Sequence, residues 1–174
     1  MDFSLPRTTS LLRRTPAALP ALLSGLPDAW LSGSEGPGAW SPYQVVAHLA
    51  SIEETDWMDR VQVFLERNPE RPFRPVDREA GFRRFSGWSL ADILGRFASV
   101  RQSNLEMLEA GVGEGDLGLR AVHPAFGTVT LGQLLATWVV HDMNHLGQIV
   151  QAMAKQYRDA VGPWRELLPI LDAG

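Results

Sequence analysis

The chain has 174 residues, 45% of them apolar, and a formal net charge of -4 at pH 7. This length and apolar share support a single domain with one hydrophobic core, which we expect to cover residues 1–174. The acidic balance and the absence of a basic patch argue against a nucleic-acid partner. Because the sequence contains no cysteine, disulfides, thiolate metal ligands and a cysteine nucleophile are excluded.

The first helical pattern lies at residues 9–25 and is interrupted by proline. Thr15 and Pro16 suit an N-cap and a first helical position, yet the residues before them also favour a helix. We therefore expect a bend or a short break near Pro16. Residues 26–40 are rich in glycine and proline, which predicts a loop.

The second helix has a clear start signal: Ser41 caps it, Pro42 takes its first position and Gln44 can complete a capping box. It should run to about Asn68, where a proline follows. A polar connection is expected at residues 69–87. Its arginines alternate with acidic residues, which favours a solvated segment over a functional patch. They are Arg71, Arg74, Arg78, Arg83 and Arg84.

Two further helices complete the pattern. The third runs from a cap at Ser89 to about Gly111, because glycine is typical of a helix end. The fourth opens with a second capping box at Thr130 and runs to about Tyr157. A short amphipathic tail at residues 164–171 should dock on the bundle. We find no convincing strand alternation, so the sequence predicts an all-α four-helix bundle with long connections.

The N-terminal residues lack the basic start and the continuous apolar run of a secretory signal. No apolar stretch of the sequence is long enough to cross a bilayer. We therefore expect a cytoplasmic protein that does not act at a membrane.

Two histidines, His141 and His145, lie one helical turn apart in the fourth predicted helix. At this spacing the imidazoles are about 40° apart on the helical wheel and can bind one metal ion. Apolar residues share their arc, so the pair should face the interior. His48 in the second helix could supply a third nitrogen. Three nitrogen ligands leave a position open for water or substrate, as in a catalytic metal site.

The spacing alone leaves open the alternative that these are hydrogen-bonded core histidines. The zinc-protease motif HExxH is absent, because Asp142 follows His141 where that motif has glutamate. His123 precedes a proline in the loop before the fourth helix, which is more typical of a turn contact than of a ligand. The six tryptophans favour core and helix-end packing over a binding cage.

Several charged residues fall on the apolar arcs of the predicted helices. We hypothesise that Arg101 and Asp142 pair across the interior, because a buried guanidinium needs an anion. Asp56 and Arg60 lie one helical turn apart in the second helix. Both pairs suit a structural role; alternatively, Arg101 or Arg60 binds a substrate carboxylate. Gln148, Asp142 and Asp56 are available to hydrogen-bond the histidines or to transfer protons.

Two segments together resemble a known family. They are Val45-Val-Ala-His48-Leu-Ala-Ser-Ile-Glu-Glu, and His123-Pro-Ala-Phe-Gly127 leading into Thr130-Leu-Gly-Gln-Leu-Leu-Ala-Thr-Trp-Val-Val-His141-Asp-Met-Asn-His145-Leu-Gly-Gln-Ile. This ordered set of histidines is similar to the DinB/YfiT-like superfamily. The resemblance implies a bundle with up-down-down-up connectivity and frequent homodimers. It also implies a divalent ion, zinc or nickel, bound by His48, His141 and His145.

Members of that superfamily include transferases and isomerases that use low-molecular-weight thiols such as bacillithiol or mycothiol. Others are described only as metal-dependent hydrolases or as stress-induced proteins. The resemblance thus implies a metal-dependent enzyme that activates an external thiol, or water, for attack on a small electrophilic substrate. The alternative is a non-enzymatic stress-response protein in which the metal site stabilises the fold or a dimer. A cavity beside the histidines would favour the enzyme, and a site sealed by Trp57 and Trp138 the alternative.

Overall fold

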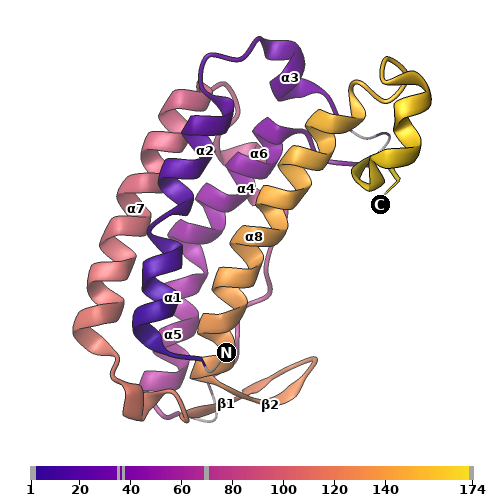
Figure 1. The fold of residues 1–174 in the computed structure, drawn as a ribbon. Coiled ribbons are helices and arrows are strands. Elements are labelled where there is room, and N and C mark those ends of the chain that lie inside the picture. The colour runs from indigo at the N-terminus through magenta and orange to yellow at the C-terminus, as the bar shows by residue number, and fades with distance from the viewer. Residues whose placement is uncertain (1–2, 35, 37, 69–70, 173–174) are drawn as a thin grey trace.

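The computed structural model of the protein describes residues 3–34, 36, 38–68 and 71–172, which form a helical bundle with one small hairpin (Figure 1). The bundle has four rods, two of them built from consecutive helices. They are α1 (Leu5–Leu12) with α2 (Thr15–Leu23), α4 (Pro42–Thr55) with α5 (Trp57–Leu65), α7 (Leu90–Gly111), and α8 (Leu131–Lys155).

The rods run up, down, down and up in chain order (Figure 1). The start of α1, the end of α7 and the start of α8 lie at one end of the bundle, together with the hairpin. α4 packs against both α7 and α8, while α1 packs against α8 and α2 against α7. The predicted four-helix bundle and its connectivity are confirmed.

Side-chain caps set where three of the long helices begin. The N–H of Gln44 donates to Ser41 Oγ (3.3 Å), and the N–H of Ser41 donates to Gln44 Oε1 (2.9 Å). Thr130 and Gln133 form the same reciprocal pair at the start of α8. Ser89 caps α7 through its hydroxyl. These bonds satisfy N–H groups that have no partner in a first helical turn, and they confirm the predicted starts.

Two of the predicted helices differ from expectation in their details. The first rod begins at Leu5, earlier than predicted, and it is interrupted just before Thr15. The hydroxyl of Thr15 does not cap α2; it donates to Asp142 Oδ2 (2.7 Å). An irregular residue, Asp56 (φ -120°, ψ -55°), separates α4 from α5, and α5 ends at Leu65. No proline or glycine marks the break at Asp56, so the helical period could not indicate it.

The connections contain elements that the sequence did not predict. α3 (Asp28–Ser32) lies in the first loop and α6 (Ala80–Arg84) in the second. β1 (Arg120–His123) pairs with β2 (Gly127–Thr130) in an antiparallel hairpin, which corrects the expectation of no strands. Gly127 has φ +70°, a conformation that glycine adopts readily in a turn. Strands of four residues are too short for their alternation to be recognised.

The C-terminal tail forms two 3₁₀ turns, Gly162–Leu167 and Pro169–Leu171. The second turn contacts α8 and buries Leu171, so this part docks as predicted. Trp164 is 71% exposed and does not dock. No helix within the described ranges is long and apolar enough to cross a membrane.

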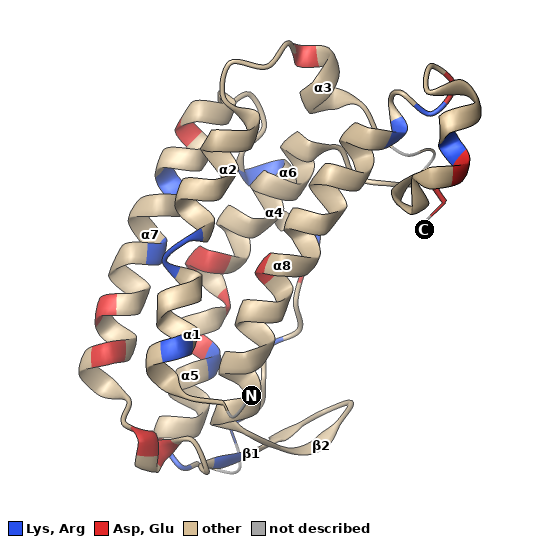
Figure 2. Ribbon diagram, viewed as in Figure 1, with Lys and Arg blue, Asp and Glu red and all other residues tan. Residues whose placement is uncertain are grey.

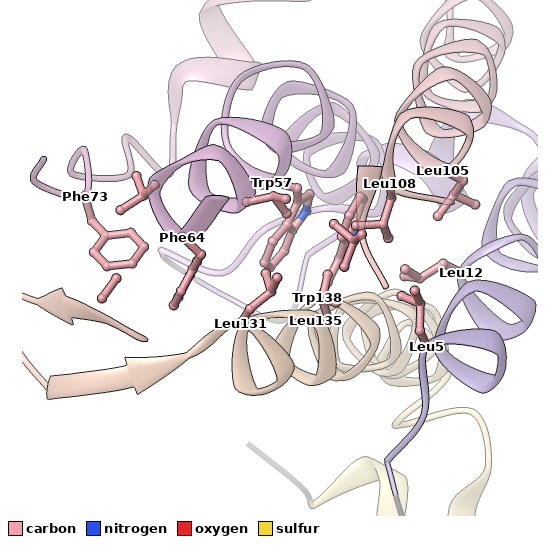
Figure 3. Close-up of a cluster of buried hydrophobic side chains, with 14 of the residues drawn as sticks. Leu5, Leu12, Trp57, Phe64, Phe73, Leu105, Leu108, Leu131, Leu135 and Trp138 are labelled. Carbon is pink, nitrogen blue, oxygen red and sulfur yellow. The ribbon is translucent and has the colours of Figure 1, made fainter. Parts of the chain in front are cut away.

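The hydrophobic core comprises two clusters. Figure 3 shows the first, in which Trp57 of α5 stacks on Trp138 of α8 with ring centroids 5.3 Å apart. Leucines from α1, α7 and α8 surround this pair. The second cluster joins α2, the first half of α4 and the first half of α7, with Leu19, Val45 and Phe97 fully buried. The predicted core role of the tryptophans is thus confirmed for Trp57 and Trp138.

A buried charged network joins the four rods, and Figure 2 shows charged positions at similar heights on α4, α7 and α8. Arg101 is 1% exposed; its Nη1 and Nη2 donate to the two carboxylate oxygens of Asp142 (2.6 and 3.0 Å). Nη2 also lies 2.9 Å from Glu53 Oε2, and Nη1 donates to the carbonyl oxygen of Leu12 (2.9 Å). The predicted pair between Arg101 and Asp142 is confirmed as an internal, structural contact.

Candidate metal site

Three histidines from two helices converge beside the core. His48 comes from α4, and His141 and His145 come from α8. The Nε2 atoms of His48 and His141 lie 3.3 Å apart, and one ring nitrogen from each of the three residues lies within 4.8 Å of the other two. The group could therefore hold a metal ion. The sequence predicted these three residues together, and the structure brings them together.

Hydrogen bonds orient two of the rings. His48 Nδ1 lies 3.0 Å from the carbonyl oxygen of Arg78, and His145 Nδ1 lies 2.9 Å from Gln148 Oε1. Because these oxygens only accept, each Nδ1 carries the proton and each Nε2 keeps a free lone pair. This arrangement, a ligand histidine held through its other nitrogen, is typical of metal sites.

The donor set fits a divalent ion. Two nitrogens bound tetrahedrally at 2.0–2.1 Å from zinc would lie about 3.3 Å apart, as the Nε2 atoms of His48 and His141 do. His141 Nδ1 is buried and has no hydrogen-bond partner among the described residues. Its ring is oriented instead by edge-to-face contact with Trp57, at a centroid distance of 5.2 Å.

Burial keeps the imidazoles neutral. Burial and, as the second cause, repulsion from a protonated His145 lower the pKa of His48 to about 4. Burial and both neighbouring histidines lower the pKa of His141 to about 3, and burial also lowers the pKa of His145. Neutral imidazoles at pH 7 are available as ligands without proton competition, and imidazole nitrogen suits zinc and nickel.

The histidines line a cavity of about 390 Å³, within the size range of small-molecule sites. Four apolar residues contribute to its walls, and polar residues line the remainder. The lining consists of His48, Ile52, Asp56, Trp57, Arg60, Val76, Arg78, His123, Leu134, Thr137, His141, Asn144 and His145. A neighbouring cavity of about 560 Å³ shares Arg78, Asn144 and His145 with it.

The other predicted candidates separate into two groups. Asp56 and Arg60 line the cavity, where Arg60 Nε donates to Asp56 Oδ2 (2.6 Å), and burial raises the pKa of Asp56 although Arg60 opposes it. Gln148 hydrogen-bonds His145, as its position suggested. Arg101 and Asp142 do not line the cavity; they form hydrogen bonds with each other. These contacts support the structural interpretation of Arg101, and Arg60 is the predicted arginine that lines the cavity.

Sequence reasoning missed two residues that contact the candidate ligand histidines. Trp40 stacks parallel to His145 with centroids 6.1 Å apart and contacts His48 at 4.9 Å. Arg78 orients His48 and places its guanidinium 5.3 Å from the Trp40 ring. Arg78 is exposed, as expected for a solvated segment, but its main-chain carbonyl has a contact with His48 that the sequence did not predict. A main-chain contact from an irregular loop leaves no residue signature by which it could have been found.

His123 has both a turn contact and a place in the cavity. Its Nδ1 accepts the N–H of Ala125 (3.1 Å), as the predicted turn role requires. Its ring stacks on Phe126 at 4.5 Å and contributes to the cavity wall.

Gly81 allows α6 to approach α4 beside His48. It is buried, and a Cβ there would overlap the carbonyl oxygen of Ala47 and lie 3.0 Å from the backbone nitrogen of His48. Only glycine permits this approach without displacement of the backbone. The close packing holds the segment that carries Arg78 against the histidine that it orients.

Residues 11–149, most of the chain and all three histidines, match the DinB superfamily. The chain belongs to the DinB superfamily. Its fold is similar to that of YfiT from Bacillus subtilis, with a TM-score of 0.76, 20% identity, and coverage of 89% of this chain and 90% of that one. YfiT is described as a probable metal-dependent hydrolase with an unusual four-helix bundle topology. No protein with a curated description matches this DinB sequence.

Proposed function

We propose that the protein is a metal-dependent enzyme whose His48, His141 and His145 hold a divalent ion, zinc or nickel. The observation that carries this proposal is a three-nitrogen donor set that lines a cavity of small-molecule size. Such an ion acts as a Lewis acid and lowers the pKa of a water or thiol bound at its open position. Because the chain has no cysteine, a thiol must come from outside.

The surrounding residues support chemistry on a small electrophile. Asp56 is a cavity carboxylate whose pKa is raised by burial, which suits it to accept the proton that the nucleophile releases. Thr137 and Asn144 offer hydrogen bonds to a substrate, and Ile52 and Leu134 exclude water from part of the wall. Group transfer from a low-molecular-weight thiol and hydrolysis by water both fit this arrangement. The description of YfiT as a probable metal-dependent hydrolase favours the second.

The rival function is a non-enzymatic metal-binding stress-response protein. A site sealed by Trp57 and Trp138 would favour it, but Trp138 does not line the cavity and Trp57 forms only one part of the wall. The open cavity therefore favours the enzyme. A homodimer and a small-molecule substrate are part of our proposal.

The test is turnover by untagged, zinc- or nickel-loaded protein. 1-Chloro-2,4-dinitrobenzene with 2-mercaptoethanol reports thiol transfer, and p-nitrophenyl acetate in thiol-free buffer reports hydrolysis. We expect metal-dependent turnover in one assay and its loss in His141→Ala, with Arg13→Ala as an exposed control. Failure of both assays, with dissociation of a dimer on metal removal, would support the non-enzymatic protein.

A further inference from the structure

The cavity beside the histidines carries an excess of positive charge. With histidines counted as neutral, its charged lining residues are Asp56, Arg60 and Arg78, which leaves one positive charge uncompensated. A divalent ion held by three neutral imidazoles would add two more. A confined site with this balance attracts anions.

The uncompensated charge belongs to Arg78. Arg60 is neutralised by Asp56, with which it forms an ion pair at 2.6 Å. Arg78 forms no ion pair with any described carboxylate, and its guanidinium lies 5.3 Å from the Trp40 ring. A guanidinium on an aromatic face keeps its N–H donors free at the ring edge, where they can bind a carboxylate in bidentate fashion.

The backbone of Arg78 is fixed relative to the metal site. Its carbonyl oxygen accepts the Nδ1–H of His48, and Gly81 holds the following helix against α4. Arg78 also lines both cavities, together with Asn144 and His145. Arg78 is exposed and is a lining residue of both cavities, so its side chain can contact a molecule bound beside the histidines.

Resting on the proposed function, we propose that Arg78 binds a carboxylate of the molecule that reacts at the metal site and selects small carboxylate-bearing ligands. The carboxylate belongs either to the substrate or to the external thiol. Asn144 supplies a neutral polar group on the same two cavities. Arg78 is a specificity-determining residue in this proposal, and its side chain is separate from its main-chain role at His48.

Calorimetric titration of zinc-loaded protein tests the proposal with two matched pairs of probes. Glutarate and its diamide glutaramide represent a substrate; 3-mercaptopropionate and 3-mercaptopropionamide represent a thiol. In Arg78→Gln, the affinity for at least one carboxylate should fall about tenfold or more, with that for its amide unchanged. The pair that responds identifies the source of the carboxylate. Equal weakening of carboxylate and amide, or no weakening in either pair, would overturn the proposal.

Three controls separate this site from the rest of the protein. Arg74→Gln removes a neighbouring arginine that does not line the cavity, and it should leave all affinities unchanged. Arg78→Lys should retain part of the carboxylate preference. Zinc content should be unchanged in Arg78→Gln, because the main-chain carbonyl remains. Glutarate selectivity that persists in metal-free protein, where turnover is absent, would uphold the anion site even if the enzymatic proposal failed.

Discussion

Asp142 accepts two hydrogen bonds from Arg101, and it directly follows the candidate metal ligand His141 in α8. The same guanidinium lies 2.9 Å from Glu53 Oε2 on α4, the helix that carries His48. Although burial alone would lower the pKa of Arg101, the carboxylates of Asp142 and Glu53 raise it. The network thus ties together the two helices that present the histidines.

Arg101→Met should be strongly destabilising, because it leaves two buried carboxylates without a cation. We expect the free energy of unfolding in urea to fall by about 3–5 kcal/mol. The matched control is Arg13→Met, which breaks the ion pair with Glu109 at side-chain exposures of 44% and 40%. Its expected cost is about 0–1 kcal/mol. Equal losses in the two variants would show that the buried network does not stabilise the bundle.

Gly81→Ala should weaken metal binding, because the added Cβ overlaps the Ala47 carbonyl and displaces α6 from α4. The displacement would also remove the Arg78 carbonyl from His48. We expect zinc affinity in a chelator competition to fall about tenfold or more, as on loss of a hydrogen bond that orients a ligand. Gly95→Ala on α7 is the control, since its Cβ meets nothing within 4 Å. Unchanged affinity in Gly81→Ala would contradict the role of this close packing.

Gln148→Leu should lower zinc affinity about 10–100-fold, because His145 Nδ1–H loses the oxygen that orients its ring. The far-ultraviolet circular dichroism spectrum should be unchanged. Gln102→Leu, at an exposed position of α7, makes the same substitution away from the site and should have no effect. An equal affinity in the two variants would mean that Gln148 does not orient His145.

Stability of the metal-free protein should decrease as the pH falls. The folded-state pKa values of His48 and His141, about 4 and about 3, lie below the ordinary value of 6.5, so the unfolded chain takes up protons first. The stability that depends on keeping these two histidines neutral in the folded protein is therefore fully present above pH 6.5. It is lost as the pH falls toward their folded-state pKa values of about 4 and about 3. The free energy of unfolding, measured in urea with chelator present, should depend less on pH in His48→Phe than in the wild type. The same pH dependence in both proteins would contradict this prediction.

The sequence predicted most of the fold because strong local signals coincide with tertiary packing. Capping pairs at Ser41 and Thr130 marked helix starts, and the histidine spacing on α8 marked the site. The pair between Arg101 and Asp142 followed from the cost of burying a charge. Each of these inferences rests on a side chain whose chemistry restricts its surroundings.

The remainder depends on main-chain geometry that no local pattern encodes. Arg78 orients His48 through a carbonyl oxygen, which every residue possesses. Gly81 is needed only because α6 approaches α4 closely, and that approach is a tertiary fact. The break at Asp56 lies in a continuous helical pattern. The hairpin of residues 120–130 is too short to show a strand period.

The central claim is that His48, His141 and His145 bind one metal ion. Elemental analysis of untagged protein dialysed against zinc or nickel tests it most directly, with His141→Ala and the double variant His141→Ala/His145→Ala compared under the same conditions. We expect about one ion per chain in the wild type. Both variants should keep their helical content and retain no stoichiometric metal. Full metal content in the folded double variant would contradict the account.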